Sequence, residues 1–176
     1  MIMRQGQQLL LPASPLFIWG SLIAAMVLNI VQNVGLWGRA AWSPDLVAVA
    51  LLFWVVHQPM RVGIATAFLF GLMMDVHQGS LLGQHAFAYS LLGFMALAVH
   101  RRLLWFGLLS QALQVLPLFA TTHAVELAVR MLVGDGFPGF GVLLSPLLEA
   151  LLWPLASLLL LIPQKRAPEP DANRPL

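Results

Sequence analysis

The chain has 176 residues, of which 60% are hydrophobic and only 9% are charged, whereas soluble domains usually carry about 25% charged residues. This composition excludes a soluble globular domain, because a small domain leaves much of its surface in water and could not bury so much apolar side chain. A net charge of only +2 gives no sign of nucleic-acid binding, and the lack of cysteine excludes disulfides and thiolate metal sites.

Six apolar segments approach or exceed the length of about 20 residues that a transmembrane helix needs. In chain order they are 15–36, 44–57, 61–76, 84–100, 103–129 and 143–162, separated by short polar or Gly/Pro-rich links. We therefore expect an all-α polytopic membrane protein, a six-transmembrane-helix bundle over 15–162. Residues 1–14 would form a cytoplasmic N-terminal segment, and residues 163–176, rich in proline and charge, a disordered cytoplasmic tail.

Serine–proline pairs mark three of the predicted helix starts, at Ser14-Pro15, Ser43-Pro44 and Ser145-Pro146. Serine is a favoured N-cap residue, and proline suits the first helical position, where no amide hydrogen is needed. Pro154 lies inside the last segment and should kink that helix.

Two interpretations remain open for the second and third segments, which are short. Each is near the lower limit for a transmembrane helix, so both could span the bilayer. Residues 44–76 could instead form a re-entrant hairpin, which would keep both termini on the same side because it removes two crossings.

The positions of Lys and Arg predict the orientation, since these residues favour cytoplasmic segments. With the N-terminus inside, the inner segments contain Arg4, Arg61, Arg101, Arg102, Lys165, Arg166 and Arg174. The outer segments contain only Arg39 and Arg130. We therefore expect both termini in the cytoplasm.

The predicted outer half of the bundle is acidic, because it contains Asp45, Asp75, Glu126, Asp135 and Glu149. Asp45 and Glu149 each fall in the first turn of a predicted helix, where the helix dipole favours a carboxylate. These two acids therefore have a structural explanation that requires no chemistry.

Small residues recur every four positions along the third segment, at Gly63, Ala67 and Gly71, and the series ends on Asp75. They lie on one helical face, and small residues at this spacing let another helix approach closely. The face could dock a partner helix or pack against this protein's own helices. Either interpretation buries Asp75, since a lipid-facing charge is costly.

A metal site at Asp75, His77 and His85 is a weaker hypothesis, because the spacing matches no standard metal motif and no fourth ligand is near. We expect no metal and no other cofactor. The sequence also lacks an H-E-x-x-H, a G-x-S-x-G or a phosphate-binding glycine loop, so we do not expect an enzyme.

Polar residues form stripes on three of the predicted helices. The fifth segment contains Gln111, Gln114, Thr122, Glu126 and Arg130, the first Asn29, Gln32 and Asn33, and the sixth Ser145 and Glu149. Glu126 and Arg130 are spaced as an i, i+4 ion pair. The stripes could be hydrogen-bonding contacts between helices, or they could converge on a cavity that binds a small solute.

Three stretches together resemble the MreD family of bacterial rod shape-determining membrane proteins. The first is SPDLVAVALLFWVVHQPMRVG (43–63), the second G-x-x-x-D-x-x-x-G-x-x-L-G over residues 71–83, and the third Trp153-Pro154. Ser43 departs from the arginine expected before Pro-Asp. The resemblance covers nearly the whole chain and implies a non-catalytic protein of the bacterial inner membrane, with a bundle similar to the substrate-binding subunits of energy-coupling-factor transporters.

The resemblance also implies partners in cell elongation and sidewall peptidoglycan synthesis. These are MreC as a direct partner, with MreB, RodA and its penicillin-binding transpeptidase in a larger complex within membrane lipid. The predicted partner-binding residues are Gly71, Asp75, Gly79, Gly83, Glu126 and Arg130, and the predicted structural residues are Pro44, Asp45, Trp153 and Pro154. The alternative function is a small-solute-binding subunit of a membrane transporter.

Overall fold

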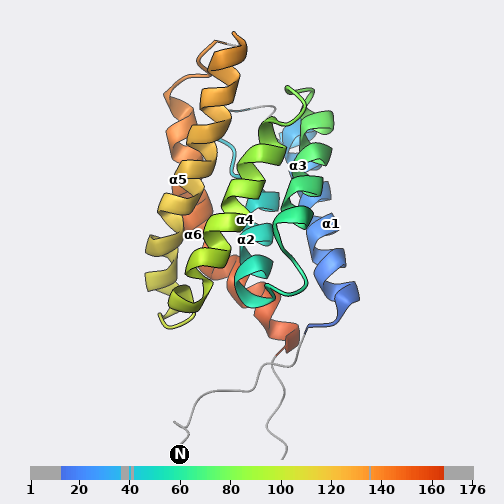
Figure 1. Ribbon diagram of the computed structural model, residues 1–176, viewed down its shortest axis with the longest axis vertical. Helices are drawn as coiled ribbons and strands as arrows, with labels where there is room; N and C mark the ends of the chain where they lie inside the picture. The colour runs from blue at the N-terminus through green and yellow to red at the C-terminus, as the bar shows by residue number, and fades with distance from the viewer. Residues whose placement is uncertain (1–12, 37–39, 41, 135, 165–176) are drawn as a thin grey trace, which may run out of the picture.

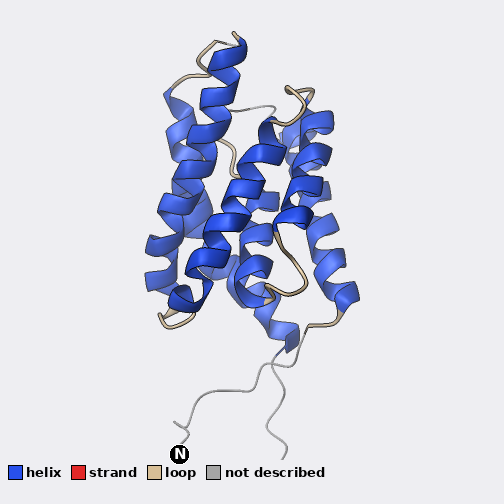
Figure 2. Cartoon of the chain, viewed as in Figure 1, coloured by secondary structure: helices blue, strands red, loops and turns tan. Residues whose placement is uncertain are grey.

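The computed structural model describes residues 13–36, 40, 42–134 and 136–164, and these residues are helical apart from short links (Figures 1 and 2). The α-helices are α1 (Pro15–Val31), α2 (Leu46–His57), α3 (Ile64–Gln78), α4 (Gln84–Leu103), α5 (Leu108–Val133) and α6 (Leu144–Leu161). A π-helical turn η1 (Gln32–Leu36) follows α1, and the 3₁₀ turns η2 (Phe140–Leu143) and η3 (Ile162–Gln164) flank α6.

All six predicted helices are present in the described residues, each within a few residues of its expected bounds. Three stretches are long and apolar enough to cross a membrane, namely Pro15–Val34, Leu108–Val133 and Phe140–Gln164, whereas α2 and α3 are shorter apolar helices. The membrane class and the helical bundle are therefore confirmed. That every helix crosses the bilayer stays a prediction.

Successive helices run in opposite directions (Figure 1). The links after α1, α3 and α5 therefore meet at one end of the bundle, which we call the upper end as in Figure 1. The α2–α3 and α4–α5 links lie at the lower end, together with the start of α1 and the end of α6. Residues 1–12 and 165–176 of the predicted terminal segments lie outside the described residues.

Helix α2 is the centre of the bundle and contacts α1, α4 and α6. All ten residues from Val47 to Val56 are buried. A helix that is covered on every side needs no polar face, which explains why this segment is apolar without helical periodicity. The core continues through Trp54, whose Nε1 donates a 2.8 Å hydrogen bond to Ser21 Oγ on α1.

The α2–α3 link reaches the lower end of the bundle. Arg61 Nη1 donates a 2.6 Å hydrogen bond to the carbonyl oxygen of Ala13, just before α1 begins. Helix α2, with 12 residues, is only about 18 Å long at 1.5 Å per residue, against a hydrocarbon thickness of about 30 Å. Its link nevertheless lies level with the start of α1, and the choice between two crossings and a re-entrant hairpin stays a prediction.

The outer surface of the bundle is apolar. Leucine side chains on the outer helices are largely exposed, for example Leu113 on α5 (74%) and Leu151 on α6 (73%). Soluble monomers rarely expose contiguous apolar patches larger than a few hundred Å². This surface is therefore suited to lipid, in agreement with the composition.

The serine–proline predictions are right at one helix and wrong at two. Ser14 caps α1, since its Oγ accepts from the amide of Phe17 at 3.3 Å. At α2 the N-cap is Asp45 in place of Ser43. At α6 the preceding η2 turn runs directly into the helix, so Ser145 lies inside α6 and its hydroxyl donates to the Ser43 carbonyl oxygen at 3.2 Å.

Candidate functional site

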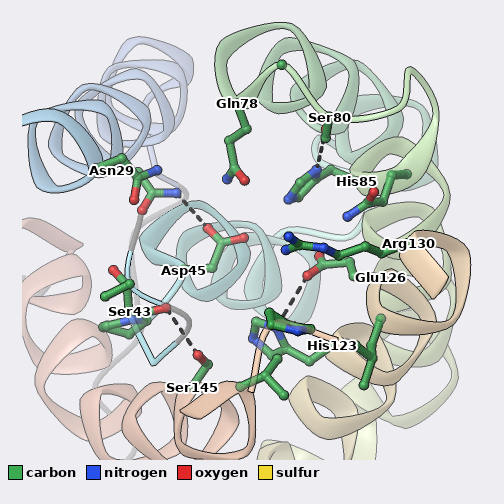
Figure 3. A pocket seen from close by; sticks show the side chains of 18 residues that line it. Asn29, Ser43, Asp45, Gln78, Ser80, His85, His123, Glu126, Arg130 and Ser145 are labelled. Carbon is green, nitrogen blue, oxygen red and sulfur yellow. Dashed lines mark hydrogen bonds and ion pairs between the residues drawn. The ribbon is translucent and has the colours of Figure 1, made fainter. Parts of the chain in front are cut away.

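A polar cavity of about 480 Å³ lies at the upper end of the bundle (Figure 3). Ligand pockets are usually about 300–1,000 Å³, so this volume could hold a small molecule. Side chains from all six helices or their caps line it: Asn29, Asn33, Asp45, Gln78, Gln84, His85, His123, Glu126, Leu127, Arg130 and Ser145, with Ala40, Ser43, Pro44, Gly79, Ser80, Pro138 and Val142 from the links.

Asp45 joins three helices at the floor of this cavity. Its Oδ1 caps α2 by accepting from the amides of Val47 (3.0 Å) and Ala48 (3.2 Å), and it also accepts from Asn29 Nδ2 on α1 at 3.0 Å. Its Oδ2 accepts from the hydroxyl of Tyr89 on α4. The carboxylate is therefore saturated by donors, which allows a buried charge in this position.

Glu149 on α6 and His123 on α5 extend this network. Glu149 Oε1 accepts from the backbone amide of Asp45 at 2.9 Å and lies 2.7 Å from His123 Nε2. The other ring nitrogen of His123, Nδ1, lies 3.3 Å from Glu126 Oε2. His123 thus bridges two carboxylates and links α5 to α6.

Asp75 forms a separate contact between α3 and α4. Its Oδ2 accepts from the amide of Gly83 at 2.8 Å, and its Oδ1 lies 2.8 Å from both the amide nitrogen and the Nδ1 of His85. Ser80 Oγ adds a 3.0 Å bond to Oδ1. A side chain of α3 therefore caps the first turn of α4, where the N-cap Gly83 has no side chain to do so.

Three glycines shape the same helix pair. A Cβ at Gly71 would lie 2.4 Å from the Cα of Ala86, so only glycine allows this approach of α3 to α4. Gly79 (φ +62°) ends α3 and Gly83 (φ +106°) precedes α4 in the left-handed region that glycine tolerates. The small-residue face of α3 is thus used, at Gly71, for packing within this chain.

Glu126 and Arg130 do not form the i, i+4 ion pair that their spacing suggested. Glu126 contacts His123 instead, and its Oε1 is buried without a hydrogen-bond partner in the described residues. Arg130 is exposed, lines the cavity and extends toward its centre (Figure 3). His123, three residues before Glu126 on the same helix, contacts Glu126 in place of Arg130. Sequence spacing alone could not distinguish these two contacts.

The remaining polar-stripe and structural residues are split between the two ends of the bundle. Gln32 Nε2 donates to Ser43 Oγ and, at 3.1 Å, to the carbonyl oxygen of Pro44 at the upper end. Gln111 lies near the lower end, where its Nε2 donates to the Phe106 carbonyl oxygen at 2.9 Å.

Trp153, fully buried on α6, donates from Nε1 to Gln111 Oε1 at 3.1 Å. Pro154, the next residue, lies inside α6, which continues to Leu161. The alternative in which the polar stripes converge on one cavity is therefore met only in part, because Asn29, Glu126 and Ser145 line the cavity whereas Gln111 and Glu149 do not.

Sequence reasoning missed Tyr89 and the bridging role of His123. Tyr89 is the only tyrosine in the chain, and a buried tyrosine hydroxyl usually has a partner, so its position inside a predicted span was an available signal. The hydrogen bond to Asp45 crosses from α4 to the start of α2 and depends on the fold. Within the described ranges, no group of three or more His, Asp or Glu residues could hold a metal ion.

The model of the rod shape-determining protein MreD family matches residues 13–162 of the chain. The chain belongs to the MreD family. A rod shape-determining protein MreD from Haemophilus influenzae is 28% identical over 148 residues, which cover 81% of this chain and 89% of that relative. No solved structure matches significantly, so the similarity to energy-coupling-factor transporter subunits stays a prediction.

MreD membership places the chain in rod shape determination, in a family of structural rather than enzymatic proteins. The apolar helices agree with the membrane location of MreD proteins. In this MreD chain the acid after Pro44 has a structural role, since Asp45 both caps α2 and connects α1 with α4.

Proposed function

We propose that this protein is a non-catalytic scaffold of the bacterial cell-elongation machinery in the inner membrane, and that it binds MreC directly. The observation that carries the proposal is the use of its buried acids. Asp45, Asp75 and Glu149 each bond to a helix other than their own. Such bonds fix the arrangement of the bundle, as a docking platform requires. MreB, RodA and the penicillin-binding transpeptidase would join through the larger complex.

The described basic residues support a cytoplasmic lower end. Arg61, Arg101 and Arg102 lie in or beside the lower links, and Arg130 lies at the upper end. Arg4, Arg39, Lys165, Arg166 and Arg174, as well as Asp135, lie outside the described residues. With this orientation the cavity faces the periplasmic side, and both termini are cytoplasmic.

The partner surface we propose is the outward stripe of α3. Gly71 and Asp75 face α4 inside the bundle, so in this proposal they support the surface from behind. Leu69, Met73 and Val76, spaced along one helical face, are 58%, 47% and 72% exposed. A single transmembrane helix of MreC could pack on this stripe, with its periplasmic continuation near Gly79, Glu126 and Arg130.

Co-purification of MreC with the tagged chain tests this surface. Met73→Trp should lower MreC recovery several-fold at unchanged membrane abundance, because a bulky ring would hold the partner helix away. The matched control is Leu151→Trp on α6, a lipid-facing position that should leave recovery unchanged. Normal MreC recovery with Met73→Trp would place the contact elsewhere.

The cavity supports a second candidate function, the binding of a small solute. Its volume of about 480 Å³ is within the usual ligand range, and Asn29 and Glu126 both line it. Binding of a solute is compatible with a scaffold and does not require transport.

A further inference from the structure

Two cavity residues of opposite charge, Glu126 and Arg130, each leave polar atoms without a hydrogen-bond partner among the described residues. Asp45 is saturated by four donors, but Glu126 uses only Oε2, while Oε1 is buried and unbonded in the described residues. Leaving a buried carboxylate oxygen without a donor is costly. A ligand that donates to Glu126 Oε1 would remove this cost.

Arg130 is the complementary group, one helical turn further along α5. Its guanidinium extends into the cavity (Figure 3) and has no hydrogen bond or ion pair among the residues that the structure places. An i, i+4 glutamate and arginine normally interact, and here they do not. Glu126 and Arg130 therefore bring an acceptor and a cation to the cavity from positions about 6 Å apart along the axis of α5.

We propose that the cavity binds a small zwitterion with free ends, an amino acid or short peptide, with its ammonium on Glu126 Oε1 and its carboxylate on Arg130. Arginine is suited to the second contact because its planar guanidinium binds carboxylates with two parallel hydrogen bonds. The inference rests on the second candidate function and names its ligand class. Because the solute assay contains no MreC, its outcome does not depend on the MreC contact proposed near Glu126 and Arg130.

The other lining residues fit a peptide group between the two charged ends. Gln78 and Gln84 line the cavity and have no side-chain hydrogen bond within the described part of the chain, and an amide side chain can both donate and accept. Leu127, Pro138 and Val142 add apolar lining on the α5–α6 side.

Ligands of a single charge fit less well. A purely cationic ligand would meet the unpaired Arg130, and a purely anionic one would approach Asp45 and Glu126. A neutral sugar would lack an aromatic side chain to stack on, because none of the lining residues is Phe, Trp or Tyr. A zwitterion supplies a donor to Glu126 Oε1 and an acceptor to Arg130 at once.

Thermal unfolding of the full chain in lipid nanodiscs, followed by tryptophan fluorescence, tests the proposal. The probes are glycine, diglycine and triglycine with free ends, which separate a free amino acid from a peptide as the source. The matched blocked probes are N-acetyl-diglycine, which lacks the ammonium, and diglycinamide, which lacks the carboxylate. We expect at least one free-ended probe to raise the melting temperature with increasing concentration, and both blocked forms to bind at least about tenfold more weakly.

The variants Glu126→Gln and Arg130→Gln should each weaken binding of the free-ended probe about tenfold or more. The control Arg101→Gln at the lower end should leave binding of the probe unchanged. Equal shifts with free and blocked probes would overturn the zwitterion assignment and leave solute binding standing. No shift with any probe would overturn both. Because the blocked probes act on the unaltered chain, a variant that fails to fold does not remove the test.

Discussion

At the scale of single residues, Asp75 shows why a chain with so few charges places one inside an apolar helical bundle. A carboxylate in lipid is costly, but the side chain of Asp75 is 0% exposed and surrounded by donors. The amides of Gly83, His85 and Ala86 lie at the start of α4, where the helix dipole favours a negative charge. Asp75 is thus a capping group supplied by a neighbouring helix.

Asp75→Asn should lower the free energy of unfolding by about 1–3 kcal/mol, the cost of weakening hydrogen bonds to a buried charged acceptor. The measurement is the melting temperature of the purified protein in detergent. His77→Asn, two residues further along α3, is the control and should change it little. Equal effects of the two substitutions would contradict the capping role.

Tyr89→Phe should lower the free energy of unfolding by a similar amount, although it removes only one oxygen atom. It leaves Asp45 Oδ2 without its hydroxyl donor, and an unsatisfied buried acceptor costs about 1–3 kcal/mol. A matched substitution without a polar atom, Phe119→Leu in the core, should lower stability through packing alone. Adding Asp45→Asn to each variant separates the two causes, because only Tyr89→Phe should then be non-additive.

At the scale of helices, the α3–α4 pair depends on the absence of a side chain. Gly71 lies against the backbone of Ala86, and the Asp75 contacts close the same pair one turn further along. Small residues allow such close approach of helices in a membrane. The pair therefore has both a packing contact and a polar contact on one face.

Gly71→Ala should destabilise the protein by about 1–3 kcal/mol, as expected for overpacking, because the new Cβ would lie 2.4 Å from Ala86 Cα and 2.6 Å from its nitrogen. Gly20→Ala on α1 is the control, since a Cβ there meets nothing within 4 Å. Alanine in a helix interior is preferred over glycine by about 0.5–1 kcal/mol, so this variant should be neutral or more stable. Thermal unfolding and membrane abundance of both variants check the prediction, and a stable Gly71→Ala protein would contradict it.

The helices themselves were predictable because apolar length and helix breakers are local properties of the sequence. The contacts of the polar residues were not. The i, i+4 spacing predicted an ion pair between Glu126 and Arg130. In the structure Glu126 contacts His123, and the same imidazole also contacts Glu149 across the α5–α6 interface. Asp45 displaced Ser43 as the cap because its carboxylate can also receive Asn29 and Tyr89 from other helices. Such choices depend on which helices are neighbours.

At the scale of the whole molecule, the polarity of the two ends distinguishes the possible arrangements in the membrane. The upper end contains the cavity and its acids, and the lower end contains Arg61, Arg101 and Arg102. The positive-inside rule predicts that the lower end is cytoplasmic. A re-entrant hairpin over residues 44–76 would instead keep the α2–α3 link from reaching the cytoplasm.

Labelling of single cysteines with a membrane-impermeant maleimide decides this, because the chain has no cysteine of its own. Met60 in the α2–α3 link is 95% exposed and Leu82 in the α3–α4 link is 67% exposed, so either site should react where water and reagent reach it. The cells are treated so that the reagent crosses the outer membrane but not the inner membrane. Leu82→Cys should then be labelled, whereas Met60→Cys should be labelled only after the inner membrane is opened. Labelling of Met60→Cys from outside would mean that α2 and α3 do not both cross, or that the bundle is inverted. Leu82→Cys separates these two cases, because in an inverted bundle the cysteine at position 82 would not be labelled from outside.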